Sequence, residues 1–98
     1  MDRLLVNKRY RSTLYDLQKA YRAHALLIGA EKTAKNEGYT NSILAGNNVT
    51  NATKDGDIAA QRLTIDAIKK QGEIRCLESE VAYLQIVIKY GLDLETEE

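Results

Sequence analysis

The chain has 98 residues, and its 14 Lys and Arg are balanced by 14 Asp and Glu, so its formal net charge is zero. This length provides for one domain, and the balance disfavours a protein that binds nucleic acid through bulk positive charge. A composition that is 44% hydrophobic and 29% charged predicts a folded chain. The sequence has no proline, which favours long helices because proline breaks a helix interior.

A first helix is predicted from about residue 8 to residue 36. Its end is indicated by the sequence Asn36-Glu37-Gly38, since glycine often follows the last helical residue. The segment Leu4–Val6 either extends this helix or packs as a separate short piece. Apolar and aromatic residues recur at alternating spacings that keep one helix face toward a partner, and they are Tyr10, Leu14, Leu17, Tyr21, His24 and Ile28.

A second helix is predicted from about residue 57 to residue 90, with Asp57 as its N-cap and Gly91 as its stop. Residues 91–98 are then an acidic tail. The same alternation runs through Ala60, Leu63, Ala67, Lys70, Ile74, Leu77, Val81, Leu84 and Ile88. Outside this stripe, Ile58, Ile65 and Ile68 widen the apolar surface beyond one face.

The polar stretch between the two helices, residues 37–56, is predicted to be a connection of about 20 residues, longer than the roughly 2–8 that usually join helices. The fold class is therefore all-α: one domain over residues 1–98, built as a long antiparallel helical hairpin. Charge supports this arrangement, because residues 1–35 carry a net +5 and residues 73–98 a net −5, which an antiparallel turn places side by side.

A two-helix hairpin buries only one seam, whereas the second helix is apolar on more than one face. We therefore expect the hairpin to self-associate into a coiled-coil-like helical bundle. The residues expected at the seam of this homo-oligomer are Leu14, Leu17, Tyr21, Ile28, Ile74, Leu77, Val81, Leu84 and Ile88.

A basic stripe on the first helix is the candidate ligand site. Arginine forks bind phosphate oxygens, and tyrosine can stack on a base. The residues expected to contact an anionic ligand are Lys8, Arg11, Tyr15, Lys19 and Arg22, with Asn47 and Asn48 from the connection. The alternative, which we favour, is a solvated face paired with Glu78, Glu80 and the acidic tail.

No set of residues indicates catalysis, so we do not expect an enzyme, a cofactor or a metal ion. The one histidine, His24, is either a ligand-contacting or pH-sensing group or, as we favour, a partly buried seam residue. The one cysteine, Cys76, is predicted to be a small apolar residue near the seam. Asp55 and Asp57 are better explained as turn and cap residues than as a carboxylate pair.

The first functional hypothesis is a non-enzymatic helical oligomer that acts through protein–protein contact as an adaptor, assembly factor or inhibitor, of a kind frequent in phages and mobile elements. The alternative is an oligomer that binds or sequesters a small anionic ligand such as a nucleotide. Nucleic-acid binding through the basic first helix is weaker still. The sequence shows neither a signal peptide nor a membrane span, so we expect a cytoplasmic, intracellular protein with no membrane partner.

Overall fold

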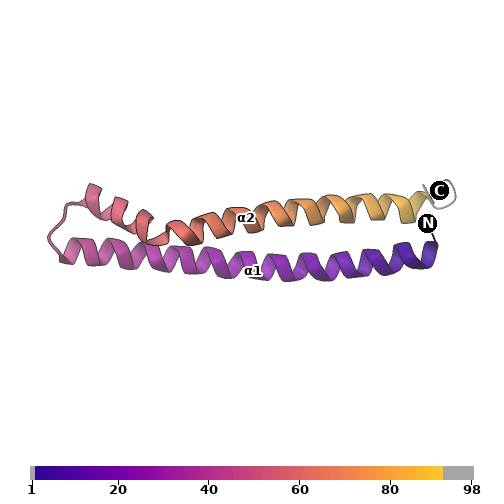
Figure 1. Ribbon diagram of the computed structural model, residues 1–98, viewed down its shortest axis with the longest axis horizontal. Helices are drawn as coiled ribbons and strands as arrows, with labels where there is room; N and C mark the ends of the chain where they lie inside the picture. Colours follow the sequence, from indigo (N-terminus) through magenta and orange to yellow (C-terminus); the bar gives the residue numbers. More distant parts are fainter. Residues whose placement is uncertain (1, 92–98) are drawn as a thin grey trace. The chain divides into compact units, whose positions relative to one another are not determined.

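A computed structural model describes residues 2–91, and within that range the chain forms two long helices (Figure 1). Helix α1 spans Arg3–Leu44 and helix α2 spans Val49–Tyr90, with 42 residues in each. Only residues 45–48 join them. The prediction of an all-α antiparallel helical hairpin is confirmed. The predicted acidic tail, Gly91 excepted, lies outside the described residues.

Contacts between the helices divide the chain into two units. Unit 1 combines the start of α1, up to Tyr21, with the end of α2, from Gly72 onward. Unit 2 is the segment Arg22–Gln71, which contains the turn between the helices. Each unit has its own packing.

The core of unit 1 is built from large aliphatic side chains. Near the chain end, Val6 packs with Leu84 and Val87. Further along, the start of α1 again lies against the end of α2 (Figure 1) in a cluster of Leu17, Ala20, Ile74 and Val81, flanked by Tyr10, Leu14 and Leu77. Because α1 begins at Arg3, the segment Leu4–Val6 belongs to this helix and does not pack as a separate piece, and Val6 is fully buried.

The buried stripe of α1 agrees with the predicted one only in part: Leu17 is buried, and Tyr10 and Leu14 pack against the core of unit 1. Thr13 and Ala20 are buried, whereas Tyr21 and Ile28 are exposed. On α2 the prediction holds better, although Val87 is buried in place of Ile88. The prediction follows the large apolar side chains, whereas a close approach between two helices favours small residues in the contact. A stripe that is shifted by one residue has the same helical period, so spacing alone does not distinguish the two stripes.

The expected 20-residue connection is wrong, because α1 continues to Leu44 and α2 begins at Val49. The turn is closed by Gly46, whose φ is +93°. The Gly46 N–H donates to the Ile43 carbonyl and the Asn47 N–H donates to the Ser42 carbonyl, which is a Schellman motif. Helix α2 starts with Asn48, not Asp57, as its N-cap.

Two glycines that resembled turn residues instead let the helices of unit 2 touch. A Cβ atom added at Gly38 would lie 2.9 Å from the Ala59 Cβ, and one added at Gly56 would lie 2.7 Å from the Lys35 carbonyl oxygen. Only glycine permits such an approach without a shift. This contact helps to explain why residues 37–44 and 49–56 are helical, since the two helices are held against each other there.

Helix α2 ends at Tyr90, as predicted. Gly91 has a φ of +68°, and its N–H donates to the Val87 carbonyl at 2.8 Å. Over the part of the chain that the structure describes, neither helix has a stretch long and apolar enough to cross a membrane.

Substitution by alanine should change the stability of the protein in opposite directions at a glycine that contacts the other helix and at a glycine whose Cβ position is open. Gly56→Ala should destabilise the protein by about 1–3 kcal/mol, the usual cost of overpacking. Gly29→Ala is the matched control, because nothing lies within 4 Å of its Cβ position, and alanine should stabilise that helix by about 1 kcal/mol. Urea unfolding measures both, and equal effects at the two sites would contradict the close contact at Gly56.

Candidate functional site

The basic stripe predicted from the sequence lies on an exposed face of α1. Its residues Lys8, Arg11, Tyr15 and Lys19 belong to unit 1, and Arg22, also exposed, begins unit 2. The Lys19 ammonium lies 5.0 Å from the centre of the Tyr15 ring, a cation–π contact that occupies this tyrosine face. Within residues 2–91, Lys8 and Arg11 form no ion pair.

An open hollow of about 410 Å³ lies beside the start of α1, lined by Leu4, Asn7, Lys8 and Arg11. The two cations lie one turn apart, and Asn7 adds an amide. The side chain of Asp2 caps the helix by accepting a hydrogen bond from the Leu4 N–H at 3.0 Å. This set of groups has the chemistry to hold a small anion against the exposed end of the helix.

The other two predicted ligand contacts, Asn47 and Asn48, lie in the turn of unit 2 and have local roles. The Asn47 amide donates to the Ser42 hydroxyl at 3.0 Å. The Asn48 side chain accepts from the Asn51 N–H at 2.8 Å. The Ser42 hydroxyl in turn donates to the Asp55 carboxylate at 2.6 Å. Both asparagines therefore shape the turn, and neither lies in the same unit as Lys8.

The carboxylates that we expected to pair with the basic stripe contact other residues. Glu80 forms an ion pair with Arg9, at 2.5 Å between Nη2 and Oε1, and Glu78 accepts a hydrogen bond from the Tyr21 hydroxyl. Gln85 donates to the Tyr10 hydroxyl at 3.2 Å. These polar contacts follow the edge of the unit 1 core, and they leave Lys8 and Arg11 without an acidic partner among the described residues.

The hydrogen bond to the Glu78 carboxylate raises the pKa of Tyr21, with smaller contributions from desolvation and from the carboxylate charge. A phenol must be protonated to donate this bond. The contact therefore stabilises the fold at pH values below the ordinary tyrosine pKa, and this contribution is lost as the pH rises through the higher folded-state pKa.

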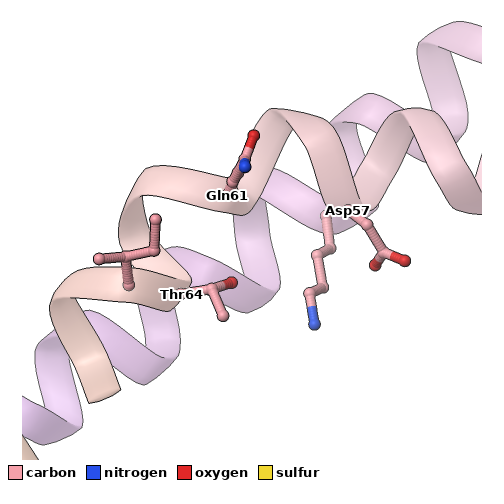
Figure 2. A pocket seen from close by; sticks show the side chains of 5 residues that line it. Asp57, Gln61 and Thr64 are labelled. Carbon is pink, nitrogen blue, oxygen red and sulfur yellow. The ribbon is translucent and has the colours of Figure 1, made fainter. Parts of the chain in front are cut away.

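A second hollow, of about 330 Å³, lies in unit 2 and is lined by Lys35, Asp57, Gln61, Thr64 and Ile65 (Figure 2). The Thr64 hydroxyl is already engaged with Glu31. Asp57, which we expected to cap a helix, is an exposed residue within α2. In the described part of the chain, no three His, Cys, Asp or Glu side chains gather as metal ligands.

The single histidine and the single cysteine lie in different surroundings. His24 is half-buried on α1, in unit 2. Cys76 is exposed, so it lies outside the core of unit 1. It follows the buried Ile74 by two residues, which turns it about 200° around the helix axis at 3.6 residues per turn.

Sequence reasoning missed an exposed face on the end of α2, where Tyr83, Ile86 and Tyr90 remain outside the core of unit 1. Their spacing of three and four residues is the same signal that indicated the seam. The sequence carries this signal, but the prediction of a second helix that is apolar on more than one face does not single out these three residues.

Comparison of the chain with models of protein families, with curated proteins and with solved structures found no match.

The Tyr21–Glu78 contact predicts a selective change in tyrosine ionisation. Glu78→Gln removes the charge and weakens the acceptor, so the pKa of Tyr21 should fall toward its ordinary value. Absorbance at alkaline pH, compared with Tyr21→Phe to isolate this tyrosine, measures the change. Tyr15→Phe is the control, since Tyr15 contacts Lys19 instead. An unchanged Tyr21 titration in Glu78→Gln would contradict the contact.

Proposed function

We propose that this protein is a non-enzymatic helical oligomer that acts through protein–protein contact. The observation that carries this proposal is the core of unit 2, all of whose residues the structure describes. Its buried residues are all small, namely Ser42, Ala52, Gly56, Ala60 and Ala67. No large apolar side chain is buried within Arg22–Gln71.

The same unit exposes many large apolar side chains. Leu26 is 76% exposed and Ile68 is 62% exposed. The full set is Leu26, Ile28, Tyr39, Ile43, Leu44, Val49, Ile58, Ile65 and Ile68. Burying one such side chain is worth about 1.5–3 kcal/mol, so unit 2 has a large potential gain from contact with another apolar surface.

A second copy of the chain is the partner that we propose for this exposed apolar surface. On α2, Ile58 and Ile65 are seven residues apart and Ile68 follows after three more, a heptad spacing that packs against an identical stripe. Association of identical chains through such stripes gives a closed symmetric bundle. The adaptor, assembly or inhibitor role is then performed by the assembled bundle, whose surface presents copies of the same groups together.

Substituting two of these isoleucines should weaken association with little effect on the fold of one chain. Ile65→Gln combined with Ile68→Gln removes exposed apolar surface and should lower the mass seen by sedimentation equilibrium. The melting temperature of the wild type should rise with concentration, because association stabilises the native state, and this dependence should shrink in the variant. Lys69→Gln, at the exposed position next to Ile68, is the control. Wild-type and variant chains that are both monomeric would contradict the proposal.

A second candidate, binding of a small anionic ligand, is favoured by one specific observation, the hollow beside Lys8 and Arg11. Neither cation has an ion-pair partner within residues 2–91, so both are available to an anion, although the Asp2 carboxylate caps the same end of the helix. Such a ligand is compatible with an oligomer.

Phosphate and a panel of nucleotides test this candidate by thermal shift. A ligand at about 100 times its Kd stabilises the native state by about 2.7 kcal/mol. Lys8→Gln with Arg11→Gln should abolish the shift, and Lys54→Gln should leave it unchanged. Absence of any shift in the wild type would exclude this function for the compounds used. Binding of RNA or DNA, the weakest hypothesis, requires a steep loss of affinity with salt.

A further inference from the structure

On the exposed face at the end of α2, the side chains change from small to large along the helix. It is formed by six residues of unit 1 at alternating spacings of four and three, all of them exposed, which we call the outer stripe: Gly72, Cys76, Ser79, Tyr83, Ile86 and Tyr90. The first three are small, and the last three are large. The spacing places all six along one side of the helix.

Gly72 has no explanation within its own chain. A Cβ atom at this position would meet nothing within 4 Å, and glycine inside a helix is less stable than alanine. Gly38 and Gly56 show the contrasting case, since their Cβ positions are filled by the opposite helix. Gly29 also has an open Cβ position, but Gly72 lies in line with the large exposed side chains of the outer stripe, where the missing side chain leaves room for a close neighbour from another molecule.

The occupant that fits the outer stripe is the outer stripe of a second copy, running antiparallel. The alternating spacings of the outer stripe are the same when the helix is followed in the opposite direction, so each residue of one stripe lies opposite one residue of the other. Gly72 then faces Tyr90 of the second copy, Cys76 faces Ile86, and Ser79 faces Tyr83. A small residue meets a large one at every level, which is how facing layers interdigitate without voids.

A parallel arrangement fits worse, because Gly72 would face glycine and Tyr90 would face tyrosine. That pairing leaves voids at the start of the stripe and crowds bulky side chains at its end, and both defects are destabilising. We propose that two copies of this chain associate through an antiparallel, twofold-symmetric contact between their outer stripes. This inference rests on the proposed oligomer and adds a second contact surface, with its register, to the isoleucine stripe of unit 2. Ile58, Ile65 and Ile68 lie outside this contact.

Cys76, the one cysteine in the sequence, makes the register measurable. In the proposed contact the two Cys76 residues are offset by ten residues along the helices, about 15 Å at 1.5 Å per residue, so they cannot form a disulfide, which needs Cα atoms within about 7 Å. Position 86 of the second copy, in contrast, lies opposite Cys76.

Mild oxidation of Ile86→Cys, with Cys76 retained, should therefore yield a disulfide-linked dimer as the main product, and the oxidised wild type should yield none. Ile86→Cys combined with Cys76→Ala is the matched control, and it should also yield none, because the two thiols at position 86 are equally far apart. A second pair, Ser79→Cys with Tyr83→Cys in Cys76→Ala, should form linked dimers at the neighbouring level.

Sedimentation under reducing conditions separates the two proposals. If the wild type is an oligomer but neither facing pair forms linked dimers, or if the wild type links through Cys76, the antiparallel contact is wrong and the proposed oligomer stands. If the wild type is a monomer at high concentration, the proposed function fails together with this contact.

Discussion

Two helices packed along a single seam can bury only one face of each helix, and this constraint governs the whole molecule. In unit 1 the seam is lined by residues as large as Leu17 and Leu84, so the pair of helices has a core of its own. In unit 2 the seam is lined by alanine, serine and glycine. Small residues bring the two backbones into contact at Gly38 and Gly56, but they remove little apolar surface from water.

The closeness of the helices in unit 2 and the exposure of its isoleucines are consequences of the same packing. A seam of small residues has no room for large side chains, so these occupy the remaining faces of α1 and α2. Polar contacts then carry part of the stability, as in the bond from Ser42 to Asp55. The seam of unit 2 buries little apolar surface, and contact with another chain would bury more of it. We therefore expect association to stabilise the fold, so that the two are coupled.

The helices and their antiparallel order could be predicted from the sequence, because spacings of three and four residues report the helix period directly. The end of α2 could be predicted too, since Gly91 adopts the positive φ that favours glycine. The turn could not be placed correctly. Gly38 and Gly56 resemble turn residues in isolation, and only the helix crossing shows that they are contact residues. Asn48 and Asp57 are equally good N-caps by residue type.

Less of the candidate site could be predicted. The exposed basic stripe followed from spacing, but the partners of Glu78 and Glu80 did not, because several cations on α1 were equally plausible from the sequence. Tyr21, a predicted residue of the oligomer seam, is exposed within its own chain and donates a hydrogen bond to Glu78 at the edge of the unit 1 core. The outer stripe has the same period as the seam, and only the structure shows which of the two apolar faces of α2 is covered.

A native mass spectrum of the wild-type protein tests the central claim, self-association, most directly, because it gives the number of subunits and the mass of any bound small molecule together. We predict an oligomer of identical chains. A chain that stays monomeric at concentrations well above the micromolar range would contradict it, since the exposed apolar faces would then have no role in assembly.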